Sequence, residues 1–239
     1  MAVPITLYTA KVCPYAQRVE LAFAEAGIDV TKYFIDLQNK PEWFAPKINP
    51  ASKVPAVAYG GPPTSPENPS PESVKLAESL ILVEFVADLA PKSGLLPSDP
   101  VQRAQARFFV DTVSNKYVPG FAAFVMRGDS PEGLLAGFQA VQDLLPKEGL
   151  ALGGNQFTIA DAAFLPFLGR TELLLRTGVG KYQAAEGKKV YSQLFEDAKF
   201  ARLQKYFKDA TQRESWKTFY TNDISETMLA RIGRAKSDL

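Results

Sequence analysis

The residue in this sequence best placed to do chemistry is Cys13, the one cysteine of the chain. It lies between a short apolar run at residues 3–8, which predicts a buried strand, and a helical pattern over residues 14–26. Proline is favoured at the first helical position, so Pro14 predicts that Cys13 is the N-cap residue. Its sulfur would then face the unpaired amides and the positive end of the helix, which stabilise a thiolate. A lone cysteine is more often a small buried hydrophobe, but this position favours a reactive group.

Two later pairs of residues could build a binding site beside such a sulfur. The strand predicted at residues 53–59 contains Val54 and Pro55, which indicate either an edge strand or a cis bond that exposes the Val54 backbone to a peptide-like ligand. Glu78 and Ser79 begin the next predicted helix. They are either simple capping residues or groups that bind a charged ligand.

Composition excludes several other kinds of chemistry. The 239 residues include 27 basic and 26 acidic ones, a net charge of +1, which indicates no general affinity for nucleic acid or an anionic membrane. One cysteine and no histidine exclude an intramolecular disulfide, an ordinary zinc site, and Cys-His or Ser-His-Asp catalysis. We expect no metal. The sequence predicts neither a signal peptide nor a membrane span, so we expect a cytoplasmic protein.

The elements that must position these residues follow two patterns along the chain. Residues 1–90 predict an α/β domain of order β-α-β-α-β-β-α. We expect strands at residues 3–8, 30–35, 53–59 and 73–76, helices at 14–26 and from 78 onward, and a short helical turn within 38–44. The segment at residues 60–71 contains five prolines and predicts a turn-rich surface loop.

Residues 91–97 have the composition of a linker, and residues 98–239 predict an all-helical domain. We expect helices from Pro100 through Tyr117 and beyond with a bend at Pro119-Gly120, at residues 131–145, after a capping box at Thr158–Asp161, and at residues 200–207 and 214–220.

The ordered set of motifs resembles the glutathione transferase superfamily, in which a thioredoxin-like domain precedes a helical one. Within it, Cys13-Pro14-Tyr15-Ala16 is similar to the omega class, as are residues 39–44, Asn49-Pro50 and Thr158–Asp161. The resemblance covers nearly the whole chain. The long loop at residues 60–71 is a departure that could alter access to the site.

The resemblance implies a catalytic Cys13 and a surrounding site for glutathione, the co-substrate. Glu78 would pair with the ammonium group, and Ser79 would hold the γ-glutamyl carboxylate. Val54 would exchange backbone hydrogen bonds with the cysteinyl unit. The remaining implied glutathione-binding residues are Tyr15, Lys40 and Lys53, of which the lysines would neutralise the glycyl carboxylate.

A cysteine nucleophile implies a thiol transferase that forms a mixed disulfide with glutathione. Because the chain has no second cysteine, a second glutathione must resolve that disulfide. The class implies glutathionylated thiols and small adducts as substrates, with dehydroascorbate reduction as a further activity. It also implies a homodimer and a hydrophobic site between the domains, toward which Phe167 and Arg170 would point. The alternatives are a non-catalytic carrier of apolar ligands and, less attractive because no apolar stretch is long enough, a channel-like relative.

Overall fold

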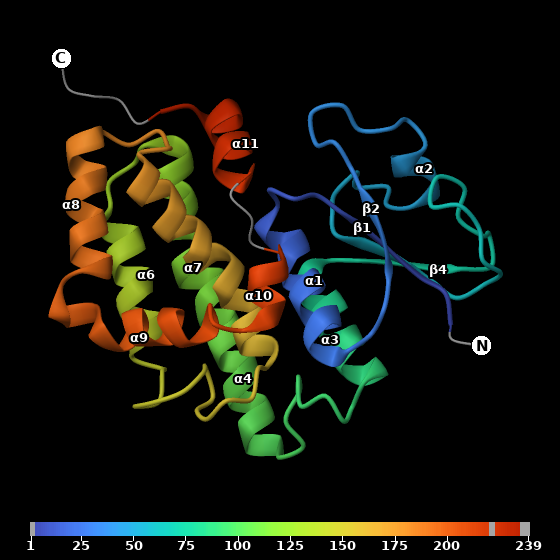
Figure 1. Cartoon of the computed structure of the whole chain (residues 1–239), viewed down its shortest axis with the longest axis horizontal. Coiled ribbons are helices and arrows are strands. Elements are labelled where there is room, and N and C mark those ends of the chain that lie inside the picture. The colour runs from blue at the N-terminus through green and yellow to red at the C-terminus, as the bar shows by residue number, and fades with distance from the viewer. Residues whose placement is uncertain (1–2, 220–222, 235–239) are drawn as a thin grey trace. The chain divides into compact units, whose positions relative to one another are not determined.

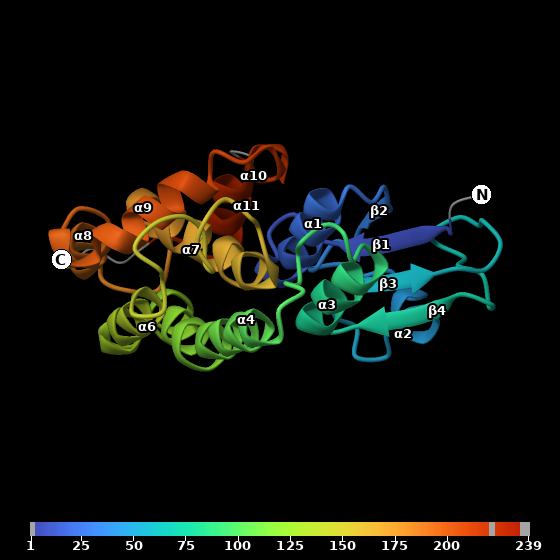
Figure 2. The same ribbon diagram turned by 90° about the horizontal axis from the view of Figure 1, so that it is seen from below.

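The computed structural model describes residues 3–219 and 223–234, and the chain divides between Leu95 and Leu96 into two compact units. The first unit contains a four-stranded sheet with helices, and the second is built from helices (Figures 1 and 2). No helix among these residues has the length and apolar character needed to cross a membrane.

The sheet of the first unit has the strand order β2-β1-β3-β4. The strands are β1 (Ile5–Thr9), β2 (Thr31–Phe34), β3 (Ala56–Tyr59) and β4 (Val74–Ala77). β1 pairs with β2 in parallel, whereas the β1–β3 and β3–β4 pairs are antiparallel. The predicted order of elements, β-α-β-α-β-β-α, is confirmed.

The third strand is shorter than predicted and lies inside the sheet. It begins at Ala56 because Pro55 has no N–H to donate to a ladder. The interpretation of Val54-Pro55 as part of an edge strand is wrong, since β3 lies between β1 and β4. The Val54-Pro55 peptide bond is cis, as the alternative interpretation had it.

The first helix, α1 (Pro14–Ala26), has the bounds that local sequence signals predict. Pro14 occupies its first turn, and Gly27 ends it in the left-handed conformation with φ 65°. There the N–H of Gly27 donates to Ala24 O at 3.2 Å. α1 packs along α3 (Ser79–Leu89), and α3 in turn packs on β3 and β4. The remaining helix of this unit is the short α2 (Phe44–Lys47).

The second unit contains eight α-helices within the described residues. They are α4 (Pro100–Thr112), α5 (Val118–Phe121), α6 (Glu132–Gln142), α7 (Ile159–Thr177), α8 (Ala184–Phe195), α9 (Ala201–Ala210), α10 (Glu214–Phe219) and α11 (Asp223–Ile232). The central one is α7, which packs against α4, α8, α9 and α11 and is buried over most of its length.

The structure shows what forms at two predicted features of this unit, the capping box before α7 and the bend at Pro119-Gly120. The capping box is confirmed, because the N–H of Thr158 donates to Asp161 Oδ2 at 2.9 Å and the Thr158 side chain accepts from the backbone N–H of Asp161. At the predicted bend, α5 is flanked by two π-helical segments, Val113–Tyr117 and Ala122–Arg127. The sequence did not indicate α8 or α11, and the predicted end of α10 at Tyr220 lies outside the described residues.

Candidate functional site

A cavity of about 450 Å³ opens in the first unit, beside the start of α1. It is lined by Cys13, Tyr15, Leu37, Lys40, Asn49, Lys53, Val54, Pro55, Glu78 and Ser79. Seven of these are the residues that the sequence assigned to the nucleophile and to glutathione binding. The first unit alone thus brings a thiol, a carboxylate and two lysines to one hollow.

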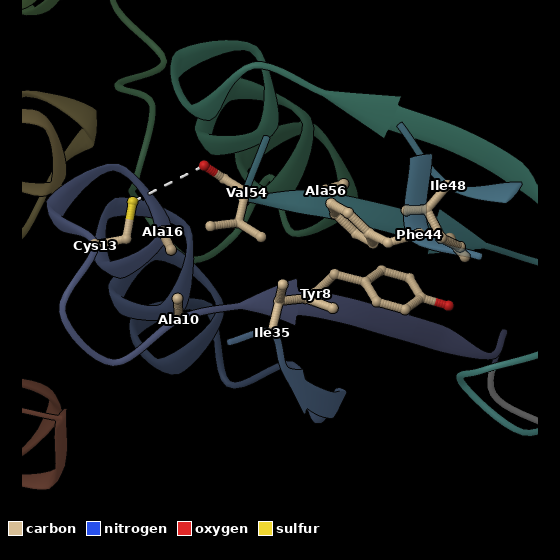
Figure 3. Close-up of a cluster of buried hydrophobic side chains, with 10 residues drawn as sticks. Tyr8, Ala10, Cys13, Ala16, Ile35, Phe44, Ile48, Val54 and Ala56 are labelled. Carbon is tan, nitrogen blue, oxygen red and sulfur yellow. Dashed lines mark hydrogen bonds between the residues drawn. The ribbon is translucent and has the colours of Figure 1, made fainter. Parts of the chain in front are cut away.

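Cys13 lies where this cavity meets the apolar core. It is the N-cap residue of α1, with φ −82° and ψ 113°, and only 9% of it is exposed. It belongs to a buried cluster that also contains Tyr8, Ile35, Phe44 and others, and Figure 3 shows its sulfur at one end of that cluster. The interior therefore holds the Cys13 backbone and Cβ while the residue still lines the cavity.

The sulfur of Cys13 faces a backbone carbonyl group across the cavity wall. Cys13 Sγ lies 3.9 Å from Val54 O, the contact drawn as a dashed line in Figure 3. Within the described structure its side chain makes no capping hydrogen bond to α1. A thiol is a weak donor, and a carbonyl oxygen can accept its hydrogen bond. The predicted effect of the first-turn amides on the sulfur stays a prediction.

A buried cation, Arg18, interacts electrostatically with the nucleophile, and sequence reasoning did not assign it. Arg18 is only 2% exposed, and its Nη1 donates to Ser79 Oγ at 3.3 Å. Its guanidinium carbon lies 5.3 Å from the ring centre of Tyr15. Burial lowers the pKa of Arg18 to about 10, and attraction to Tyr15 and Cys13 opposes that change. The signal available in the sequence was its spacing, one turn after Pro14 on the same helix.

Glu78 has a backbone conformation that is unusual for a residue with a side chain. Its φ is 72° and its ψ 112°, a region that side chains other than glycine rarely occupy. In the described structure its side chain makes no capping hydrogen bond to α3. The interpretation of Glu78 as a simple capping residue is therefore wrong. Its exposed side chain lines the cavity next to the buried Ser79.

The lysine side of the cavity is built on a tight loop after α2. Asn49 Nδ2 donates to Lys53 O at 2.8 Å, and Asn49 Oδ1 accepts from the N–H of Ala51 at 3.1 Å. Lys40 Nζ donates to Ser52 O at 2.6 Å. Asn49 thus shapes the loop. This loop contains Lys53, and its Ser52 carbonyl holds Lys40. Sequence reasoning used Asn49 only as part of a resemblance.

The two residues predicted for a hydrophobic substrate site lie in the helical unit. Phe167 and Arg170 belong to α7 and are 2% and 1% exposed. Phe167 packs edge-on against Phe121, with ring centres 5.9 Å apart. Arg170 Nη1 donates to Pro166 O at 2.9 Å. Neither lines the cavity described above, and their assignment stays a prediction.

The proline-rich loop also stays outside the cavity lining. None of residues 60–71, all of which the structure describes, lines it. The described part of the chain contains no group of three or more Cys, Asp or Glu side chains that could hold a metal ion.

Comparisons with known proteins give this arrangement a family. Residues 7–94 match the family model described as glutathione S-transferase, N-terminal domain. Glutathione S-transferase omega-1 of Mus musculus is 31% identical over 176 residues, which are 71% of this chain and 68% of that protein.

Two solved structures from Trametes versicolor extend the likeness to the helical unit. Glutathione transferase Omega 1C is 53% identical, with a TM-score of 0.94 and 100% of both chains covered. Omega 2S, crystallised in complex with 2,4-dihydroxybenzophenone, is 40% identical, with a TM-score of 0.90 and coverage of 97% of this chain and 99% of that one. The cysteine at the start of α1, the cavity around it and these relatives agree: the chain belongs to the glutathione transferase family, as an omega-like enzyme of the cysteine type.

Proposed function

We propose that this enzyme transfers glutathione between thiols, removing it from small adducts and mixed disulfides through a Cys13–glutathione disulfide. The observation that carries the proposal is the shared cavity of Cys13 and the charged residues expected to bind the tripeptide. Omega-type relatives support glutathione-dependent activity in general.

The groups around the cavity complement those of glutathione. Glu78 pairs with the ammonium of the γ-glutamyl unit, and Ser79 at the start of α3 holds its carboxylate. The Val54 backbone exchanges hydrogen bonds with the cysteinyl unit in the manner of an added strand. The substrate N–H then donates to the carbonyl oxygen that Cys13 contacts in the free enzyme, which releases the sulfur for reaction.

Lys40 and Lys53 attract the glycyl carboxylate at the other end of the tripeptide. Both side chains are exposed, so their contribution is electrostatic and depends on salt. The bond from Lys40 to Ser52 O holds the first lysine near the cavity before glutathione arrives. The central cysteinyl sulfur is thereby directed toward Cys13.

The first chemical step is thiol–disulfide exchange. The Cys13 thiolate attacks the glutathione sulfur of a mixed disulfide, a new sulfur–sulfur bond forms, and the bonding pair of the old one leaves with the substrate thiolate. Arg18 stabilises the thiolate, because its buried cation lies over the ring of Tyr15 and attracts the charge of Cys13. The leaving thiolate takes a proton from water.

The second step uses another molecule of glutathione. Its thiolate attacks the glutathione sulfur of the Cys13 adduct, forming oxidised glutathione and returning the electron pair to Cys13. The chain contains one cysteine, so no internal thiol can perform this resolution. The cycle is balanced: one free glutathione is consumed for each adduct reduced, and it leaves in oxidised glutathione together with the glutathione moiety of the adduct.

Intact mass measurement tests this proposal directly. After exposure to oxidised glutathione, the wild-type protein should gain one glutathione, and added reduced glutathione should remove it. Cys13→Ser should gain none and lose activity toward a glutathionylated peptide. Full activity in Cys13→Ser would overturn the assignment of the nucleophile.

A second candidate function is the binding of aromatic ligands without turnover. It is favoured by the complex of the 40% identical Omega 2S with 2,4-dihydroxybenzophenone. Calorimetry with this compound, on the preparation used for the mass measurement, separates the two functions. Binding with no adduct and no turnover supports a carrier, whereas turnover supports the transferase.

We also propose a homodimer. Large apolar side chains are exposed on both units: Val74 and Ile81 on the first, and Val101 and Phe108 one above the other on α4. Light scattering should give twice the mass of the chain, and Phe108→Glu should lower it. A mass of one chain for the unmodified protein would refute the dimer.

A further inference from the structure

The loop at residues 60–71 reaches three elements of the first unit through three consecutive residues, Pro66, Glu67 and Asn68, which we call the clasp. Each accepts a hydrogen bond from a different element. The bonds run from Tyr8 Oη in β1 to Pro66 O (2.6 Å), from Tyr33 Oη in β2 to Glu67 Oε1 (3.0 Å), and from Lys47 Nζ in α2 to Asn68 Oδ1 (3.0 Å). Figure 1 shows this loop beside α2.

The loop is built to hold one shape. Its five prolines restrict the unfolded chain, so little conformational entropy is lost on ordering it. At its base Gly61 has φ 71° and approaches Ser70 so closely that a Cβ would lie 2.8 Å from Ser70 Oγ. At its tip the N–H of Asn68 donates to Ser65 O at 3.0 Å, which forms a turn. The clasp is therefore presented on a stiff support.

The element that the clasp reaches last, α2, is a short helix whose Phe44 is buried in the core cluster that also contains Cys13. It has four residues, too few for a helix to be stable alone, and the other described helices and strands pack only sparsely on it. Its start is held by aromatic contacts of Trp43 and Phe44 with Tyr8, at 6.2 and 5.9 Å between ring centres. At its end Lys47 bonds the clasp, and Ile48, directly after it, is buried in the same core cluster as Phe44.

The chain on either side of α2 makes up the lysine side of the cavity. Lys40 precedes it, and Asn49 follows Lys47 by two residues. The N–H of Asn49 donates to Phe44 O in α2 at 3.2 Å, and the Asn49 side chain fixes the carbonyl of Lys53. A displacement of α2 would therefore move the groups expected to bind the glycyl end of glutathione.

From this chain of contacts we infer that the clasp positions the Lys40–Lys53 side of the glutathione pocket from outside, by holding α2 in place. Pro66, Glu67 and Asn68 act as positioning residues, since none of them lines the cavity. The inference rests on the proposed glutathione binding for its functional consequence. Its structural part, the restraint on α2, can be measured without any substrate.

The test removes the three hydrogen bonds and keeps the aromatic rings, in the variant Tyr8→Phe/Tyr33→Phe/Asn68→Ala. Without ligand, amide hydrogen exchange over residues 44–53 should become faster by about tenfold, because the bonds lost are individually modest. With glutathione, KM should rise roughly three- to tenfold while kcat stays unchanged. Thr64→Ala, an exposed change in the same loop outside the clasp, is the matched control and should alter neither quantity.

Two results would overturn the inference. Unchanged exchange over residues 44–53 shows that the clasp does not restrain α2, and faster exchange with an unchanged KM shows that α2 does not position the pocket. If glutathione proves not to be the substrate, the exchange measurement still decides the restraint, so the two failures are distinguishable. Should the triple variant not fold, Asn68→Ala alone, on the surface, replaces it with a smaller expected effect in the same direction.

Discussion

Arg18 Nη1 donates a hydrogen bond to Ser79 Oγ over 3.3 Å and so ties the helix that carries the nucleophile to the start of α3. The side chain is only 2% exposed, and burial lowers its pKa to about 10. At neutral pH it is therefore protonated in both the folded and the unfolded chain. A permanent positive charge thus interacts with Cys13 and bonds Ser79, a residue expected to bind the γ-glutamyl carboxylate.

Replacing this charge should make Cys13 a weaker acid. In Arg18→Met the thiolate loses a nearby cation, so the pKa of the thiol rises and the pH profile of alkylation by iodoacetamide moves to higher pH by about one unit. Arg18→Lys keeps the charge and should move the profile less. Arg231→Met, an exposed change on α11, is the control. An unmoved profile in Arg18→Met would remove Arg18 from the mechanism.

The backbone of Glu78 predicts opposite effects on stability and binding. A φ of 72° costs about 1–3 kcal/mol for a residue with a side chain, and glycine costs about 0.5–1 kcal/mol in chain entropy. Glu78→Gly should therefore raise the free energy of unfolding by about 1 kcal/mol, as measured in urea, while the Kd for glutathione rises at least tenfold.

The matched control for Glu78 is Ser52, the other described residue besides glycine with a positive φ, at 51°. Ser52→Gly should also stabilise the fold, but it keeps the carbonyl that Lys40 contacts, so glutathione binding should be unchanged. If Glu78→Gly binds glutathione as tightly as the wild type, the carboxylate does not hold the ammonium group.

The two lysines can be told apart with a modified substrate. Glutathione esterified at its glycyl carboxylate lacks the charge that Lys40 and Lys53 are expected to attract. Lys40→Met should raise the KM for glutathione roughly three- to tenfold and leave the KM for the ester unchanged. Lys53→Met is measured in parallel, with Lys92→Met as the control on the surface of the same unit. An equal rise in KM for glutathione and for its ester would show that the lysine does not bind the glycyl carboxylate.

Local sequence signals predict well where the helix that carries Cys13 begins and ends. Pro14 and Gly27 set the two ends of α1 because each acts through its own backbone preference. Long-range contacts decide how the side chains of this helix are oriented. The sulfur of Cys13 turns toward Val54, 41 residues away, and Arg18 is buried against Ser79, 61 residues away. No local pattern contains these partners.

The helical unit shows the same limit at the level of whole elements. α8 contains Gly187 in its first turns, which weakens the helical signal in the sequence. The fold requires glycine there because a Cβ would lie 2.2 Å from the ring of Tyr182, a buried residue outside the helix. Packing therefore overrides local helix propensity, and the reason for a glycine at position 187 is found only in its contact with Tyr182.

The close packing of α6 on the π-helical segment Val113–Tyr117 leads to a further prediction, about Gly137. A Cβ on Gly137 would lie 2.7 Å from Tyr117 Cα and 2.9 Å from Lys116 O, which are backbone atoms that cannot turn aside. Gly137→Ala should therefore lower the free energy of unfolding by about 2 kcal/mol. A Cβ on Gly133 in the same helix would meet nothing closer than Gly120 Cα at 3.6 Å, an ordinary contact.

Gly133→Ala is therefore the matched control, and its better helix propensity should stabilise the protein by roughly 0.5 kcal/mol. Both values follow from urea unfolding monitored by circular dichroism, with the slope of each transition compared to confirm that the unfolded states are alike. The adduct at Cys13 should form normally in both variants, because the change lies in the other unit. Equal stabilities for the two variants would show that the helices separate enough to admit a methyl group, and that their close approach is not required.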